Sequence, residues 1–124
     1  MALTLANAQV VRLVDLQTAD GGSYRIGFFR GALMAGGADT YSTGGENVDA
    51  RRYFRVIDHV EIERAEDSAG GLVMGVDDTN FATGQFLVEL FRDVTPAATA
   101  DFVESAAGVD LSAHIFRIMI MGYP

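Results

Sequence analysis

The chain of 124 residues contains no cysteine and no lysine, since all 9 of its basic residues are arginines. Without cysteine it can form neither disulfides nor thiolate zinc sites, and it has no thiol nucleophile. Without lysine it can form no Schiff base, and it lacks the phosphate-binding lysine of a P-loop. The two histidines, His59 and His114, leave little material for a histidine metal cluster. These absences remove several common classes of enzyme.

Basic charge and long apolar runs are also scarce. The formal net charge is −8 at pH 7, whereas nucleic-acid-binding domains usually present a basic face, so we expect no nucleic-acid partner. No apolar run approaches the ~18 residues of a membrane span, and the start of the chain lacks the positive segment of a signal peptide. We therefore expect no membrane partner. Hydrophobic residues make up 49 % of the chain, which is ordinary for a folded domain.

Glycine is abundant, with 14 residues against 2 prolines, and it separates short apolar runs in a way that predicts strands. The turn at residues 20–23 predicts a hairpin between the first two strands. We predict a mainly β fold: a small antiparallel β-sandwich or barrel-like domain with a long glycine-rich loop. One domain spans residues 1–124, with residues 1–8 as a candidate extended arm. The predicted strands cover residues 9–16, 24–34, 54–64, 72–76, 86–92 and 114–121.

Side chains alternate between the two faces of a strand, so the pattern assigns them to faces. One face of residues 24–34 holds Tyr24, Ile26 and Phe28, and the other holds Arg25, Gly27 and Phe29. One face of residues 54–64 holds Val56, Val60 and Ile62, and the other holds Arg55, Ile57, His59, Glu61 and Glu63. Asp58 breaks the apolar face of the latter strand, and we interpret it as a buried or edge carboxylate with an arginine partner.

The last predicted strand is apolar on both faces. One face holds Phe116, Ile118 and Ile120, and the other holds Ile115, Arg117, Met119 and Met121. A strand that is apolar on both faces is usually buried on both. In a domain of this size the second covering surface can be another subunit, so the second set is a candidate subunit interface.

Residues 35–52 combine four glycines with polar residues, and Tyr41 and Val48 are their only large apolar residues. We expect this stretch to have little anchorage in the core. Unstructured stretches of about this length are unusual in small domains and tend to be functional loops or contact arms.

Three short constellations could carry chemistry, but each has a stronger structural interpretation. Asp110, Ser112 and His114 are the residue types of a catalytic triad, yet alternate residues of a strand lie about 7 Å apart, too far for hydrogen bonds of roughly 2.6–3.2 Å. Residues 77–80 (DDTN) could supply oxygen ligands to calcium but lack the EF-hand spacing, which favours a turn. Asp58 and His59 are adjacent, so a regular strand points them to opposite faces. We predict no catalytic residues, no metal site and no cofactor.

Residues 39–46 (DTYSTGGE) resemble the Y-P-T-G-G-E loop of a family of tailed-bacteriophage virion proteins associated with capsid decoration, with Ser42 in the place of the usual proline. Further segments resemble this family in the same order along the chain. They are residues 56–60 (VIDHV), 70–74 (GGLVM), 107–113 (AGVDLSA) and 116–123 (FRIMIMGY). The resemblance covers roughly residues 24–123.

The resemblance implies a structural virion protein, not an enzyme, that binds the assembled lattice of the major capsid protein and stabilises it from the outer capsid surface. Its implied partners are the major capsid protein and further copies of itself, in a homotrimer. The candidate capsid-contact loop consists of Tyr41, Ser42, Thr43, Gly44, Gly45 and Glu46. Two other functions stay open: a minor head or tail component or host-surface binding module, and a small hydrolase that uses Ser112 and His114.

Overall fold

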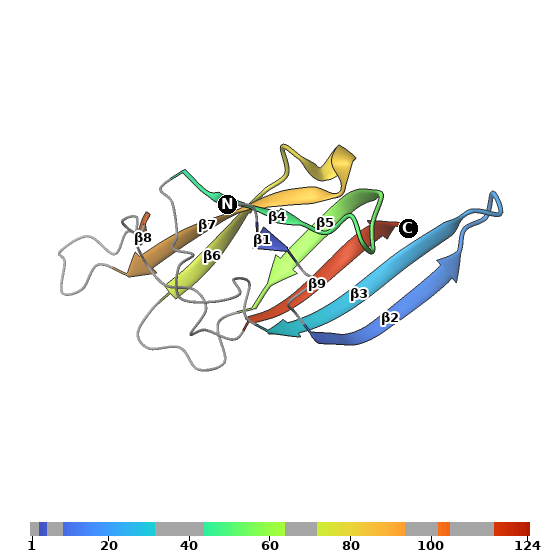
Figure 1. The fold of residues 1–124 in the computed structure, drawn as a ribbon, viewed down its shortest axis with the longest axis horizontal. Coiled ribbons are helices and arrows are strands. Elements are labelled where there is room, and N and C mark those ends of the chain that lie inside the picture. The colour runs from blue at the N-terminus through green and yellow to red at the C-terminus, as the bar shows by residue number, and fades with distance from the viewer. Residues whose placement is uncertain (1–2, 5–8, 32–43, 64–71, 94–101, 105–115) are drawn as a thin grey trace.

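The computed structural model consists of two β-sheets that share one hydrophobic core (Figure 1). It describes residues 3–4, 9–31, 44–63, 72–93, 102–104 and 116–124. All described strand pairs are antiparallel except one short pair at the edge of the first sheet. This confirms the predicted mainly β fold, and the two separate sheets make it sandwich-like.

The first sheet, sheet A, contains β4 (Glu46–Asp49), β7 (Gln85–Asp93) and β6 (Leu72–Asp77) in that order. At its edge β1 (Leu3–Thr4) pairs in parallel with β4. β4 pairs with the N-terminal part of β7, and β8 (Phe102–Glu104) pairs with its C-terminal part. Both lie on the side of β7 opposite β6. Of the candidate arm at residues 1–8, the structure thus describes only β1, which joins a sheet; the rest lies outside the described residues.

The second sheet, sheet B, contains β2 (Gln9–Gln17), β3 (Ser23–Gly31), β9 (Phe116–Tyr123) and β5 (Val56–Ile62) in spatial order. The predicted hairpin between the first two strands is confirmed. The C-terminal strand β9 is central, because it pairs with β3 on one side and β5 on the other. The short 3₁₀ helix η2 (Phe81–Thr83) precedes β7, and no described helix is long and apolar enough to cross a membrane.

The core is built from alternate residues of both sheets. Phe86, Val88 and Leu90 share one face of β7, and all three are fully buried. On β3 the buried face is the one with Gly27 and Phe29, so Tyr24, Ile26 and Phe28 point outwards. The buried hydrophobic residues are Phe29, Val48, Ala50, Phe54, Ile57, Val60, Phe86, Val88, Leu90, Phe116, Ile118 and Ile120.

The expected lack of anchorage in residues 35–52 is wrong for the part that the structure describes. Residues 46–49 form β4, which pairs with β7, and Val48 and Ala50 are completely buried. The run Glu-Asn-Val-Asp contains one apolar residue and gives no local sign of a core strand. Its burial comes from pairing with a strand about 40 residues later in the chain.

The predicted faces of β5 are also wrong at Val56 and Ile57, which precede an irregularity of the strand. The register shifts between Ile57 and His59, which leaves Asp58 as an extra residue in a β-bulge. Ile57 therefore joins Val60 on the buried face, and Val56 does not. Asp58 is exposed and contacts the Tyr24 hydroxyl, so its expected arginine partner is not found there.

The β2–β3 hairpin extends beyond the other strands of sheet B (Figure 1) and is tied back to the domain by Arg25. The Arg25 guanidinium donates to both carboxylate oxygens of Asp15, at 2.7 and 3.1 Å, and Nη1 donates to the Tyr53 carbonyl oxygen at 2.9 Å. Hydrogen bonding by Arg25 lowers the pKa of the Asp15 carboxyl below its ordinary 3.8. Arg25 thus links both strands of the hairpin to the connection between β4 and β5.

Replacing Arg25 with alanine is expected to loosen the far end of the hairpin without unfolding the core. Amide hydrogen exchange should quicken at residues 13–17 and 23–27, while Arg55→Ala, which removes an exposed arginine outside the hairpin, leaves exchange there unchanged. Because the folded-state pKa of Asp15 is depressed, the Asp15–Arg25 pair of the wild-type tether is present above pH ~4 and is lost as the pH falls through that lower pKa. Equal acid loosening in wild type and Arg25→Ala would contradict this role.

Candidate functional site: the outer face of sheet B

The face of sheet B that points away from the core carries large apolar side chains that no described residue of sheet A covers. We call it the outer face. The strand register arranges its residues in rows that cross the four strands in the order β2, β3, β9, β5. One row is Arg12, Phe28, Met119 and Glu61, and the next is Val14, Ile26, Met121 and His59.

Two further rows close the outer face at its ends. At one end lie Leu16, Tyr24 and Tyr123, and the two tyrosine rings meet edge to face with centroids 5.1 Å apart. At the other end Arg30 is paired with Arg117, whose carbonyl oxygen accepts a hydrogen bond from the Glu63 amide at 2.8 Å. The outer face is therefore apolar toward the hairpin tip and charged at the opposite end.

The apolar part of this face is exposed to an unusual degree. Leu16 is 48 % exposed, and Phe28 and Tyr123 are each 38 % exposed. Val14, Ile26, Met119 and Met121 are half-buried beside them. Large apolar side chains that lie together on a surface mark contact sites more often than isolated ones do.

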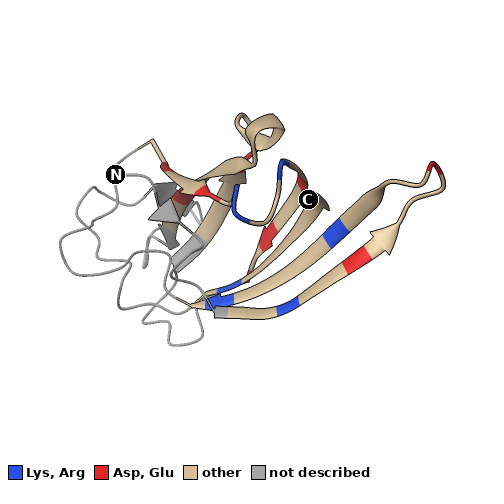
Figure 2. Ribbon diagram, turned by 45° about the vertical axis from the view of Figure 1, so that its right-hand side comes forward, with Lys and Arg blue, Asp and Glu red and all other residues tan. Residues whose placement is uncertain are grey.

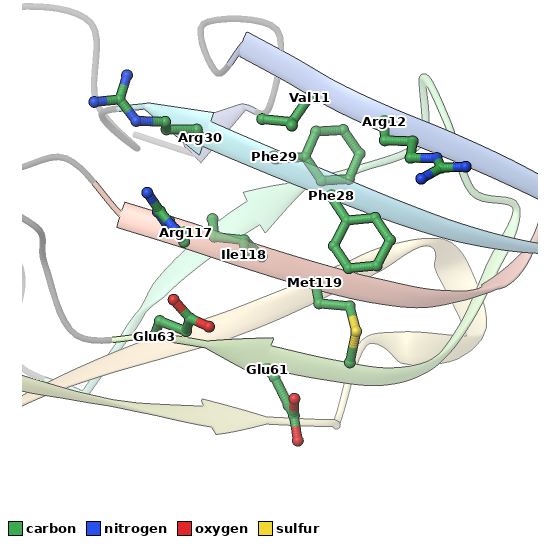
Figure 3. Close-up of a pocket in the computed structure, with 10 residues that line it drawn as sticks. All are labelled: Val11, Arg12, Phe28, Phe29, Arg30, Glu61, Glu63, Arg117, Ile118 and Met119. Atoms are coloured by element: carbon green, nitrogen blue, oxygen red, sulfur yellow. The ribbon is translucent and has the colours of Figure 1, made fainter.

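A groove of about 500 Å³ lies across the charged half of the outer face. Phe28 and Met119 lie side by side in it, with Arg12 of β2 on one side and Glu61 of β5 on the other (Figure 3). Arg30, Arg117 and Glu63 line its far end. The groove thus combines an apolar middle with opposite charges on its two sides.

Charges of opposite sign on this face come from different strands. Figure 2 colours the charged residues of the ribbon whichever face they point to. The arginines are on β2, β3 and β9, and the acidic residues are on β5. On β5, His59 Nε2 lies 3.4 Å from Glu61 Oε1, an ion pair when the histidine is protonated. Near the apolar end, burial raises the pKa of the Tyr24 hydroxyl, and hydrogen bonding to Asp58 raises it further. Tyr24 therefore stays neutral and can donate to the Asp58 carboxylate.

The structure brings together three residues of the candidate subunit interface. Arg117, Met119 and Met121 are alternate residues of β9 and all point to the outer face. Ile115 lies outside the described residues. Sequence reasoning missed Arg12, Phe28 and Glu61, which meet Met119 only through strand register. The alternation of Tyr24, Ile26 and Phe28 was a usable signal, but it did not tell which face was the core.

The candidate capsid-contact loop is described only at its end, because Tyr41, Ser42 and Thr43 lie outside the described residues. Gly44 is exposed, and Gly44 and Gly45 have positive φ angles of 97° and 107° that favour glycine. Glu46 begins β4 on the same face as Val48 and is only 5 % exposed. This burial argues against a contact between the Glu46 side chain and a partner.

Of the other two candidate sites, the structure describes residues 77–80 but not the Asp110, Ser112 and His114 set. In residues 77–80, Asp77 Oδ1 accepts hydrogen bonds from the Thr79 amide, at 2.8 Å, and from the Thr79 hydroxyl, and Asn80 donates to Asn47 at 3.1 Å. Hydrogen bonding by the Thr79 hydroxyl, and then by the Thr79 amide, lowers the pKa of the Asp77 carboxyl. The bonds hold a turn, as the structural interpretation predicts. Asp110, Ser112 and His114 lie outside the described residues, so the hydrolase hypothesis is untested.

Comparisons of this chain with protein-family models, curated proteins and solved structures found no match.

Proposed function

We propose that this chain is a structural virion protein that decorates and stabilises a bacteriophage capsid from its outer surface. In this proposal it is not an enzyme, it binds the assembled major capsid protein, and it associates with copies of itself as a homotrimer. The observation that carries the proposal is the outer face of sheet B, where exposed Leu16, Phe28 and Tyr123 offer further copies of the chain a contact surface with charged margins. The ordered resemblance of five segments to virion proteins supports the choice of partner.

Physical chemistry is consistent with this role. A protein that binds the assembled shell and not its separated subunits stabilises the shell by mass action. The formal net charge of −8 keeps the chain away from packaged nucleic acid by repulsion and disfavours aggregation of decorated particles. Function then depends on contact surfaces, and exposed apolar side chains rimmed by charge are what such surfaces require.

Imaging of virions that carry the chain, together with its copy number, tests the proposal. We expect density repeated at regular positions over the shell and a copy number in fixed proportion to the major capsid protein. A few copies at a single vertex or in the tail would overturn decoration and favour a minor head or tail component. Absence of the chain from purified virions would overturn the proposal as a whole.

The loop that resembles the family motif is expected to contribute to capsid binding. Because Glu46 pairs with Val88 in sheet A, the test is confined to residues before β4: Tyr41→Ala combined with Thr43→Ala. We expect at least a ~10-fold weaker affinity for undecorated capsids, equivalent to about 1.4 kcal/mol, with an unchanged melting temperature. An unchanged affinity would exclude the loop as a capsid contact, and a large drop in melting temperature would show that it is structural.

A further inference from the structure

The outer face of sheet B is close to electroneutral, although the chain as a whole is strongly acidic. It carries three arginines and three acidic residues: Arg12, Arg30, Arg117, Asp58, Glu61 and Glu63. These charges sum to zero, so the excess of −8 lies elsewhere on the chain. Two copies that meet through this face therefore avoid the repulsion that their other surfaces would impose.

The arrangement of these charges is complementary to that of a second copy. Arg12 is on β2 at one edge of sheet B, and Glu61 is on β5 at the opposite edge. Both are exposed and belong to the same row, with Phe28 and Met119 between them. With neighbouring strands about 4.8 Å apart, the row is roughly 14 Å wide, which places the two charges on either side of an apolar strip.

The direction of the rows restricts the rotation axis that can relate two copies. A rotation axis parallel to the strands, in front of the outer face, brings the β2 edge of one copy to the β5 edge of the next. Residues of the same row then lie at the same position along the axis. Arg12 then meets Glu61 of the next copy, while Phe28 and Met119 face the axis. An axis perpendicular to the strands would instead oppose the Arg30–Arg117 end to the Leu16–Tyr123 end. That arrangement would also set β2 against β2 of the next copy, so Arg12 would no longer meet Glu61.

We propose that copies of this chain associate through the outer face of sheet B around an axis parallel to its strands, with Arg12 of one copy paired with Glu61 of the next. Contacts that join two different edges close into a ring by rotation. Three copies form the homotrimer of the proposed function. The inference takes from the proposed function only that copies of the chain associate with one another. It does not depend on capsid binding.

A charge-exchange series on the purified full chain tests the pairing, with light scattering after size-exclusion chromatography and sedimentation as readouts. We expect wild type to have the mass of three copies, and a mass of two would overturn the trimer. Arg12→Glu and Glu61→Arg should each raise the dissociation constant at least ~10-fold, because each places like charges opposite one another. The double variant should recover most of the wild-type affinity, as a directly coupled pair does. Arg55→Glu, on the connection that leads into β5, is the matched control and should leave the mass unchanged.

A second variant tests the apolar strip. Met119→Asp should abolish association, and circular dichroism melting should show that the single copy remains folded. A wild-type mass of one copy at all concentrations would overturn the inference, as would single variants without effect or a double variant no better than either single one. These results concern the isolated chain, so they are separate from the location and copy number in virions that test the proposed function.

Discussion

Alanine in place of Gly122 is expected to cost about 3 kcal/mol or more of folding free energy, since overpacking against backbone exceeds what a well-packed interior can absorb. Gly122 is buried in β9 opposite Ile57 of β5. A Cβ atom there would lie 2.2 Å from the Val56 carbonyl oxygen and 2.9 Å from the Ile57 Cα. Both neighbours are backbone atoms, so relief requires β5 to move away from β9.

The matched control is Gly22→Ala in the hairpin turn. Its nearest atoms would be the Thr18 hydroxyl oxygen at 3.0 Å and the Asp20 Oδ1 at 3.3 Å, which are side-chain atoms of the turn and can shift without moving a strand. We expect a loss below about 1 kcal/mol there, as for most surface substitutions. Chemical denaturation of both variants measures the difference. Equal, small losses would show that β5 and β9 can separate at this point without disturbing the domain.

This prediction also bears on the outer face, because Gly122 lets β5 lie close beside β9. That contact is next to the β-bulge at Asp58, where β5 changes register. After the bulge, His59 and Glu61 take up positions beside Met121 and Met119. The position of the charged residues on β5 therefore depends on Gly122, where the close approach of β5 leaves no room for a side chain.

The bulge shows which part of β5 could be predicted from sequence. The alternating apolar pattern identified the strand and the burial of Val60, because side-chain alternation is a local property. A single extra residue at Asp58 reversed the assignment of Val56 and Ile57. A slip of one residue exchanges the two faces of a strand, and nothing in the local pattern marks where it occurs.

For the candidate site, too, the sequence predicted which residues of one strand share a face, but not which strands lie side by side. Alternation placed Arg117, Met119 and Met121 on one face of the last strand, and the structure has them there. Arg12 and Glu61 are about 50 residues apart in sequence and meet the same row only through the order β2, β3, β9, β5. Strand order depends on long-range pairing, so composition and periodicity of one segment do not contain it.

The second large effect is expected from a neighbouring pair of phenylalanines that point in opposite directions. Phe29 is 1 % exposed and packs against Tyr53 and Phe54, with ring centroids 5.2 and 6.5 Å away. Phe28 is 38 % exposed on the outer face, beside Met119. We expect Phe29→Ala to cost ~3–5 kcal/mol, because it removes a buried ring and leaves a cavity.

Phe28→Ala, by contrast, is expected to cost about 1 kcal/mol or less in a single copy, because its ring is already partly in water. Its main effect should be on association: a dissociation constant raised at least ~10-fold if the outer face joins copies, since aromatic residues near the centre of an interface contribute most to affinity. Denaturation at low protein concentration measures the first effect, and sedimentation over a concentration series measures the second. A large loss of single-copy stability with Phe28→Ala would mean that this ring belongs to the core. Unchanged association would mean that copies do not meet at the apolar strip between Arg12 and Glu61.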